Sequence, residues 1–243
     1  DRGAKLFGIS SGDRLLQLLR EKGLPHYVPP AGRTSRESIG QLLFPMVVVL
    51  ERLGYIPDQC AALAETLSLM DRLAFAYGSE VPTSGNPAKQ IARQLYGKAP
   101  TIYASYEVTD VAGLRWKQQS DENGKMLAYL ELFPELTHNH LAAVVNPAGG
   151  VKNLAPVFLR SRRERPELGL RIDATREVLA RRGVDAVESW AEGTTPMAHL
   201  LSQSYLGDFV SVYLGVLNGL DPTPTQAMSE LKSILGLADL TPH

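Results

Sequence analysis

The feature that most constrains the fold is a regular alternation of short apolar runs with longer amphipathic segments in the second half of the chain. Strands separated by helices of this length pair in parallel, and helices then cover both faces of the sheet. The second half is therefore predicted to be an α/β, doubly wound parallel sheet. The pattern predicts strands over residues 100–105, 141–145, 155–159 and 186–191, and helices over 110–126, 166–182 and 196–218.

The first half shows the same alternation only once. Residues 4–10, 13–23 and 25–30 read as a strand, a helix and a second strand, with Gly23 placed to end the helix. A single strand, helix and strand predicts a fragment of a second parallel sheet. Further helices are predicted over 38–53, 58–77 and 87–96, where Asn86 caps the third, and over 224–235 near the end.

Charge, hydropathy and cysteine content exclude several classes of protein. Twenty-five basic and 26 acidic side chains leave a net charge of −1, so nothing attracts a polyanion and nucleic acid is not an expected partner. The longest uninterrupted apolar run, 42–50, is far shorter than the roughly 20 residues of a membrane span, so none is predicted. Cys60 is the sole cysteine, so no disulfide can form within the chain, which agrees with a cytoplasmic location.

Glu122 is the first candidate for chemistry. It lies near the end of a predicted helix among the amides Gln118, Gln119 and Asn123. A carboxylate held among amides can serve as a general base. The alternative is a solvated acidic helix end, because carboxylates are usually exposed.

His138 and His140 form the second candidate. They are two residues apart before the strand predicted at 141–145, and strand alternation would place both on one face. With Glu135 they could bind zinc or manganese. His138 could instead act alone as an acid or base near neutral pH, or be a surface histidine in a loop. The residues themselves leave all three alternatives open.

Two further patterns are less specific. Arginines recur at residues 160, 162, 163 and 165 between a predicted strand and a predicted helix, which indicates a solvated basic loop. The phrase SSGD at residues 10–13 follows the first predicted strand, where backbone N–H groups can hold an anion, although Asp13 would oppose it.

Taken together, these segments resemble a known family. QSDENGK (119–125), FPELTHNH (133–140) and the stretch from GDFVSVYL to SELKSIL are similar to motifs of the bifunctional phosphoglucose/phosphomannose isomerases, as are ISSGD and PPAGRTSRESIG. Those enzymes contain two sugar isomerase (SIS) domains. The resemblance implies that residues 1–98 are the C-terminal part of an N-terminally incomplete first SIS domain plus connecting helices. Residues 99–243 would be the second SIS domain.

The resemblance also implies an activity. Family members interconvert glucose 6-phosphate or mannose 6-phosphate with fructose 6-phosphate through a cis-enediol, without a metal or other cofactor. Glu122 would move the proton between C1 and C2. His138 would assist opening of the sugar ring and would reach the site from the partner subunit of a homodimer.

The remaining implied site residues come from shorter motifs. Lys232 would also assist ring opening, and Arg36 would offset the negative charge of the enediolate. Ser10 and Ser11 would bind substrate. Thr225 matches the position associated with accepting both C2 epimers.

Departures from the family pattern motivate an alternative function. Asp121 replaces an Asn beside Glu122, Thr137 and His140 replace Asn and Glu or Gln beside His138, and Ser35 replaces the Pro before Arg36. The family's S-x-S-G-N-T-E-E-T phosphate loop is absent from these 243 residues, and the chain opens within a predicted strand without Met, so a longer protein is expected. The alternative is a non-catalytic SIS protein that binds phosphosugars.

Overall fold

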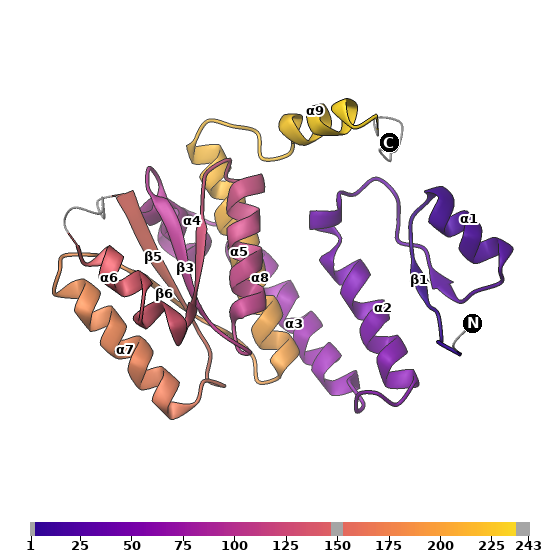
Figure 1. The fold of residues 1–243 in the computed structure, drawn as a ribbon, viewed down its shortest axis with the longest axis horizontal. Helices are drawn as coiled ribbons and strands as arrows, with labels where there is room; N and C mark the ends of the chain where they lie inside the picture. The colour runs from indigo at the N-terminus through magenta and orange to yellow at the C-terminus, as the bar shows by residue number, and fades with distance from the viewer. Residues whose placement is uncertain (1–2, 147–152, 237–243) are drawn as a thin grey trace. The chain divides into compact units, whose positions relative to one another are not determined.

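The computed structural model describes residues 3–146 and 153–236. The chain divides into two compact units (Figure 1). The larger unit comprises residues 61–224, and the smaller unit comprises residues 1–60 together with residues 225–243. This grouping does not test the predicted domain boundary between residues 98 and 99, which stays a prediction, as does the two-domain architecture.

The larger unit is built on a four-stranded parallel sheet with the order β4-β3-β5-β6. The strands are β3 (Ala99–Ser105), β4 (Tyr129–Phe133), β5 (Leu154–Arg160) and β6 (Val187–Trp190). Chain order runs outward from β3 in one direction and from β5 in the other, which is the doubly wound arrangement. The predicted α/β parallel sheet is confirmed.

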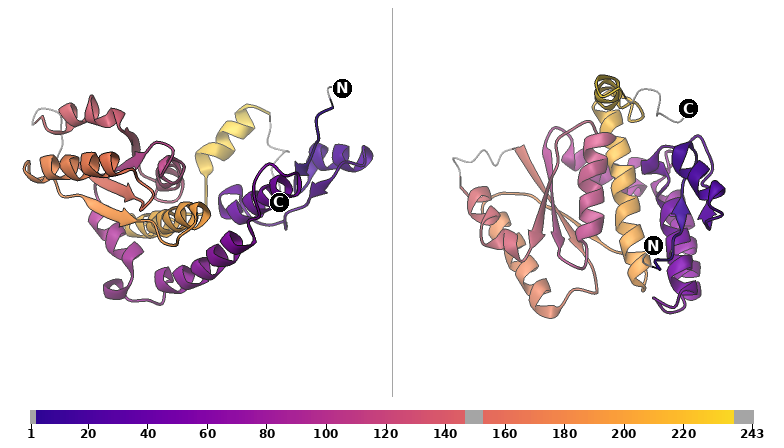
Figure 2. Two further views of the ribbon diagram at one scale, coloured as in Figure 1. Left: turned by 90° about the horizontal axis from the view of Figure 1, so that it is seen from below. Right: turned by 45° about the vertical axis from the view of Figure 1, so that its right-hand side comes forward.

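Strand side chains alternate between two apolar cores, one on each face of the sheet. Ile102, Val157 and Leu159 join the core formed with α3 (Cys60–Tyr77), α4 (Pro87–Leu95), α5 (Asp110–Glu122) and α8 (Pro196–Leu217). Tyr103 and Phe158 face the other way, toward α6 (His140–Val144) and α7 (Pro166–Ala180). Helices therefore cover both faces, as the views of Figure 2 show.

Side-chain caps and a glycine mark helix ends in the larger unit, and the predicted cap Asn86 is confirmed. The side chain of Asn86 accepts a hydrogen bond from Lys89 N at 3.1 Å at the start of α4. Thr195 Oγ1 accepts one from Ala198 N at 3.2 Å at the start of α8. Gly219 follows α8 with a φ of 71°, a conformation that glycine adopts at little energetic penalty.

The smaller unit contains a two-stranded parallel sheet and short helices. Its elements are β1 (Gly8–Ile9), α1 (Asp13–Glu21), β2 (His26–Tyr27), the 3-10 helix η1 (Ser35–Glu37), α2 (Ile39–Arg52) and α9 (Gln226–Ile234). The predicted strand, helix and strand are confirmed, but each strand has only two residues. Helix α2 buries none of its residues, although most of them are apolar.

Three sequence predictions in the larger unit are wrong. Residues 141–145 belong to helix α6 and its end, not to a strand. The edge strand β4 was missed, since only one neighbouring strand pairs with it and most of its side chains are half-buried or exposed. Helix α5 ends at Glu122, four residues before the predicted end at Met126, because Lys125 adopts a positive φ of 54°.

Helix α8 is, among the described residues, the one helix long and apolar enough to cross a membrane by length and composition. The central helix of a folded domain meets the same criterion. Just over half of the relevant window of α8 is buried inside the protein. Gln203 in its middle binds the carbonyl oxygens of Arg160 and Ser189 at the ends of β5 and β6. Its burial and these contacts show that α8 is a core helix of the larger unit.

Candidate active site

Glu122 is the last residue of α5, and buried amides hold the turn that follows it. Asn123 is buried and donates through Nδ2 to Gln119 Oε1 at 2.8 Å and to Ser211 Oγ of α8 at 3.0 Å. Asn218 Nδ2 donates to the carbonyl oxygen of Gly124 at 2.8 Å. The amide cluster seen in the sequence therefore fixes the backbone around Glu122, whose own side chain is half-buried.

Asp121, the unexpected second carboxylate beside Glu122, is engaged by other groups. Its Oδ2 lies 2.6 Å from Lys117 Nζ, and its Oδ1 accepts a hydrogen bond from Ala128 N at 3.1 Å. The positive charge of Lys117 offsets the negative charge of Asp121. The departure from the family pattern is therefore accommodated within the fold.

Lys125 is a residue that the sequence reasoning missed. Its Nζ donates to the carbonyl oxygens of Glu122 at 2.7 Å and Pro222 at 3.3 Å, and to that of Pro224. The ammonium thus joins the end of α5 to a segment almost one hundred residues later. The signal for this residue was its place as the last letter of QSDENGK, the motif that carries Glu122.

His138 lies in the loop that follows β4. It ends the 3-10 helix η3 (Glu135–Thr137), and its side chain is exposed. Thr137 Oγ1 donates to the carbonyl oxygen of Pro134 at 2.8 Å and accepts from Arg171 Nη1 at 3.1 Å. The threonine that replaces the family's asparagine therefore ties this loop to itself and to α7.

His140 points back onto the sheet. Its Nε2 lies 3.0 Å from the hydroxyl of Tyr103 on β3, and its Nδ1 lies 3.5 Å from Glu131 Oε1 on β4. Burial lowers the pKa of His140, and the negative charge of Glu131 partly opposes this change. His140 therefore anchors the loop that carries His138.

The prediction that His138 and His140 share one face of a strand is wrong. His138 ends a 3-10 helix and His140 begins α6, so the alternation of a strand does not apply. Residues two apart in a helix are about 200° apart around its axis. The pairing that suggested a metal site is therefore not formed by this segment.

Glu122 and His138 lie at opposite edges of the sheet in the larger unit. Asp121 binds the N–H of Ala128, directly before β4 begins, which places Glu122 at the amino edge. His138 follows the carboxyl end of the same strand, which has five residues. A strand of that length spans about 15 Å. One copy of this unit therefore does not bring the two side chains together at a single substrate.

The other candidate residues lie in the smaller unit. Arg36 is half-buried in η1, whose start is capped by reciprocal hydrogen bonds between Thr34 and Glu37. Thr225 precedes α9, and Lys232 lies in its last turn.

Ser10 and Ser11 follow β1 in the smaller unit. Ser10 Oγ donates to the carbonyl oxygen of Gly12 at 2.8 Å, so its hydroxyl stabilises the turn before α1, and Ser11 is exposed. Asp13 has a φ of 60° at the first position of this helix. Substrate binding by either serine stays a prediction.

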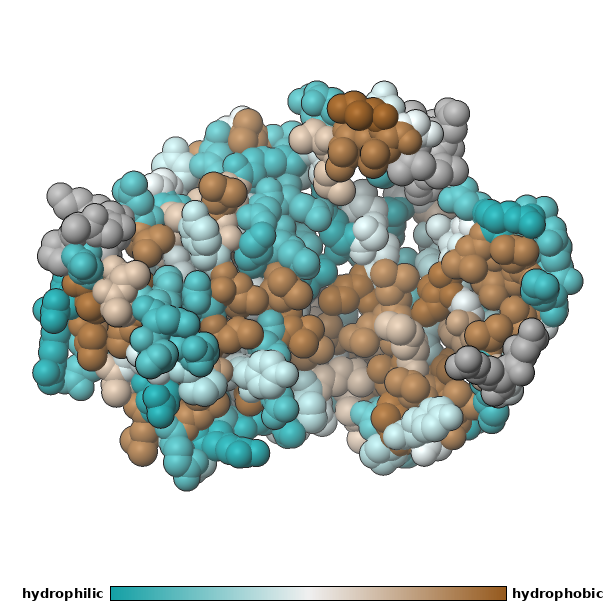
Figure 3. Space-filling view, in the orientation of Figure 1, coloured by the Kyte–Doolittle hydropathy of each residue, from teal (hydrophilic) through white to brown (hydrophobic). Residues whose placement is uncertain are grey.

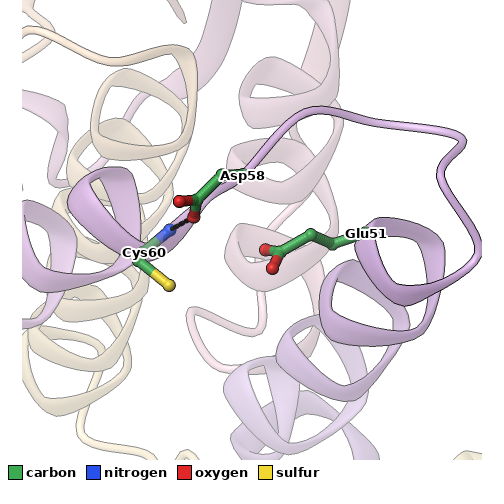
Figure 4. Close-up of side chains that lie close together, drawn as sticks. All are labelled: Glu51, Asp58 and Cys60. Carbon is green, nitrogen blue, oxygen red and sulfur yellow. Dashed lines mark hydrogen bonds between the residues drawn. The ribbon is translucent and has the colours of Figure 1, made fainter.

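A second cluster of possible metal ligands joins Glu51, Asp58 and Cys60 (Figure 4), whose ligand atoms lie within 4.8 Å of one another. Asp58 Oδ1 accepts from Cys60 N at 2.7 Å, and Glu51 Oε2 accepts from Gln59 N at 3.0 Å. Asp58 raises the pKa of the Cys60 thiol by hydrogen bonding and by its charge, which disfavours the thiolate that binds metals. Capping of the first turn of α3 accounts for this cluster.

The predicted solvated basic loop is wrong for its first residue. Arg160 ends β5 and is buried, because three carboxylates surround its guanidinium: Glu164, Asp173 and Glu188, at 3.0, 2.7 and 2.9 Å. The guanidinium also lies 4.5 Å from the ring centroid of Trp190. Arg162, Arg163 and Arg165 lie nearer the solvent, as predicted.

A buried serine and histidine also lie close together in the larger unit. Ser161 Oγ and His199 Nδ1 are 2.8 Å apart, and His199 Nε2 lies 2.9 Å from the carbonyl oxygen of Gly193. Ser161 is only 2% exposed. A hydroxyl so enclosed has no path to a substrate, so this pair joins the ends of β5 and β6 rather than forming a nucleophilic site.

The doubly wound parallel sheet places the larger unit among α/β proteins, and the family match below gives the class as proteins with SIS domains. Residues 84–235 match the family model described as "Bacterial phospho-glucose isomerase C-terminal SIS domain", and the chain belongs to that family of isomerases.

Two curated relatives match almost the whole chain. It is 30% identical over 234 residues to the bifunctional phosphoglucose/phosphomannose isomerase of Caldicellulosiruptor bescii, covering 96% of this chain and 69% of that protein. The enzyme of the same name from Aquifex aeolicus is also 30% identical over 234 residues, covering 96% and 68%. These relatives confirm the resemblance seen in the sequence motifs.

Solved structures support the fold. A glucose-6-phosphate isomerase like protein from Thermus thermophilus superimposes with a TM-score of 0.54 at 22% identity. The match covers 67% of this chain and 54% of that protein. The chain thus spans about half the length of this neighbour and about two thirds of the curated relatives.

Proposed function

We propose that this protein interconverts glucose 6-phosphate, and also mannose 6-phosphate, with fructose 6-phosphate. The observation that carries the proposal is Glu122, held at the end of α5 by buried amides and followed sixteen residues later by His138, in an isomerase family. The substrates are those named for the relatives from C. bescii and A. aeolicus. A cytoplasmic location suits these substrates and the lone cysteine.

The proposed reaction is a proton transfer through a cis-enediol. The carboxylate of Glu122 removes the proton from C2 of the open-chain aldose, the electron pair forms the C1–C2 double bond, and the aldehyde oxygen becomes a hydroxyl. Glu122 then returns the proton to C1 while the O2 hydroxyl loses its proton and becomes the ketone; the proton that O2 loses balances the one that the aldehyde oxygen gained. A single carboxylate serves both directions, because each step regenerates the group that the reverse step needs.

The other residues assist this transfer. Arg36 offsets negative charge on the enediolate, and His138 and Lys232 assist the opening of the sugar ring. Thr225 accepts substrates that differ in configuration at C2, and Ser10 and Ser11 contribute to binding. These roles rest on the family motifs and on the side-chain chemistry.

The homodimer is part of the proposal. Glu122 and His138 lie at opposite edges of the sheet in one larger unit, so a site that uses both draws them from two copies. Closed homodimers are the commonest oligomers of soluble proteins. In this arrangement His138 of one subunit would serve the Glu122 of the other.

Replacement of the base tests the reaction. Glu122→Gln keeps the shape of the side chain and removes the carboxylate, so kcat for fructose 6-phosphate formation should fall about 10³-fold. Exchange of the C2 proton of glucose 6-phosphate with D2O should fall in parallel. The control is Glu177→Gln, an exposed carboxylate on α7 paired with Arg181, which should leave both rates unchanged. Undiminished isomerisation by Glu122→Gln would overturn the mechanism.

The exchange measurement also separates catalysis from phosphosugar binding without turnover. Bound glucose 6-phosphate whose C2 proton never exchanges in the wild-type protein would indicate the non-catalytic alternative. The departures from the family motifs that suggested this alternative fit the fold, because Asp121, Thr137 and His140 all have defined partners in it.

Mixing two inactive variants tests the shared site. Glu122→Gln and His138→Ala should each be nearly inactive alone. After unfolding and refolding together, about half of the dimers formed at random are mixed, and each mixed dimer has one intact site, so about a quarter of wild-type activity should return. Recovery of no activity would show that each site is built from one chain.

A further inference from the structure

Lys125 joins two segments that the proposed mechanism leaves unconnected. Its ammonium has three donors, and these bind three backbone carbonyl oxygens, those of Glu122, Pro222 and Pro224. The side chain is half-buried, and hydrogen bonds from a charged donor are stronger than those between neutral groups. The ammonium therefore holds these carbonyl groups firmly together.

The turn that carries Lys125 has little freedom. Lys125 adopts a φ of 54°, and a Cβ added to Gly124 would lie 2.6 Å from the carbonyl oxygen of Ser120. A Cβ added to Gly215 of α8 would lie 2.4 Å from the carbonyl oxygen of Asn123. Close approach of backbone segments therefore shapes this turn, and the ammonium adds a further connection to residues 222–224.

The contact with Glu122 is made to its backbone. The carbonyl that Lys125 binds belongs to the residue whose carboxylate is the proposed base, so the ammonium fixes the point from which that side chain extends. The same ammonium holds residues 222–224, and Thr225, the proposed epimer-selecting residue, is next in the chain. A general base works only within hydrogen-bond reach of the proton that it removes.

We propose that Lys125 is a positioning residue for the isomerisation, which binds the backbone of the base-bearing turn to the segment 222–224 and so fixes Glu122 for proton transfer. This inference rests on the proposed function. In this role Lys125 touches no reacting atom and acts through the backbone of Glu122.

The test compares Lys125→Met, Lys125→Arg and a matched control. Lys89→Met is the control, because Lys89 is also half-buried and donates to two backbone carbonyl oxygens, those of Ser79 and Val81, at 2.6 and 2.8 Å. Lys125→Met should lower kcat about 10 to 100-fold, since a misplacement of about 1 Å can lower rates by that amount, and KM should change less than about 3-fold. Lys125→Arg keeps the charge and should recover most of the loss, and Lys89→Met should keep kcat within about 2-fold of wild type.

Hydrogen exchange provides a readout that does not need activity. Backbone amides of residues 119–128 and of residues 218–221 and 223 should exchange faster in Lys125→Met than in wild type or Lys89→Met. Unchanged exchange in both segments overturns the holding role, whether or not the protein isomerises sugars. Faster exchange with an unchanged kcat overturns the positioning role. If the wild-type protein has no isomerase activity, the proposed function is overturned, and with it the positioning role of Lys125. The exchange data still show whether Lys125 holds the two backbone segments together.

Discussion

Helices α8 and α2 are both rich in apolar residues, yet they differ in what covers them. Leu201, Val210 and Leu214 of α8 are buried against the sheet and neighbouring helices of the larger unit. No residue of α2 in the smaller unit is fully buried, and its residues are half-buried or exposed. Both segments are helical, so their burial depends on the elements that pack against them and not on their apolar composition alone.

The smaller unit has only a two-stranded sheet to offer. Apolar surface lies over the part of the chain that contains α2 and β1 in Figure 3. A groove of about 740 Å³ there is lined by Phe7, Tyr27, Phe44 and Val48, among others. Two strands rarely form a stable sheet alone, so the larger unit should supply most of the stability of the chain.

The largest difference between the two units is expected in the loss of unfolding free energy when an arginine of each unit is replaced. Arg160→Met leaves Glu164, whose side chain is 5% exposed, without its cation, so the free energy of unfolding should fall by about 3 to 5 kcal/mol. Arg14→Met in the smaller unit breaks an exposed pair with Glu21 at 3.8 Å, and the free energy of unfolding should change by less than about 0.5 kcal/mol. Urea denaturation of both variants measures the difference, and equal losses would contradict the contrast between the units.

Two leucines test the same contrast without charge. Leu159→Ala removes a side chain that is 1% exposed, and should lower the free energy of unfolding by about 2 to 4 kcal/mol. Leu50→Ala in α2, where the leucine is 40% exposed, should lower it by less than about 1 kcal/mol. A large loss in Leu50→Ala would show that α2 is covered in solution.

The smallest expected difference is in how the free energy of unfolding depends on pH. Burial raises the pKa of Asp208 to about 6, although Arg115 partly compensates. The folded protein therefore holds this proton more tightly than the unfolded chain, whose carboxyl has a pKa near 3.9. The free energy of unfolding should fall by roughly 2 kcal/mol as the pH rises from about 4 to above 6.

A carboxylate of the smaller unit should show the opposite trend. Hydrogen bonds from Thr34 lower the pKa of Glu37, so its contribution to stability is present at neutral pH and is lost as the pH falls through its pKa. Denaturation at pH 4 and pH 7 should show each trend disappear in Asp208→Asn and in Glu37→Gln, respectively. The same pH dependence in wild type and both variants would contradict these assignments.

The candidate site was predictable where it rests on local motifs. Glu122 and His138 could be proposed from the sequence because their motifs and their separation are properties of the chain itself. Lys125 was missed, since two of its three partners lie almost one hundred residues away in sequence. Arg160 was assigned to solvent because the carboxylate of Glu188, on another strand, cannot be placed beside it from sequence distance.

The sequence by itself determined the class of the fold, most helices and the cap at Asn86, because apolar periodicity and side-chain capping act over three or four residues. Only the tertiary structure decided that residues 140–144 are helical, that β4 forms the sheet edge, and that α5 stops at Glu122. It also placed Glu122 and His138 at opposite edges of one sheet. Such outcomes depend on packing between segments far apart in the chain, which local propensities do not encode.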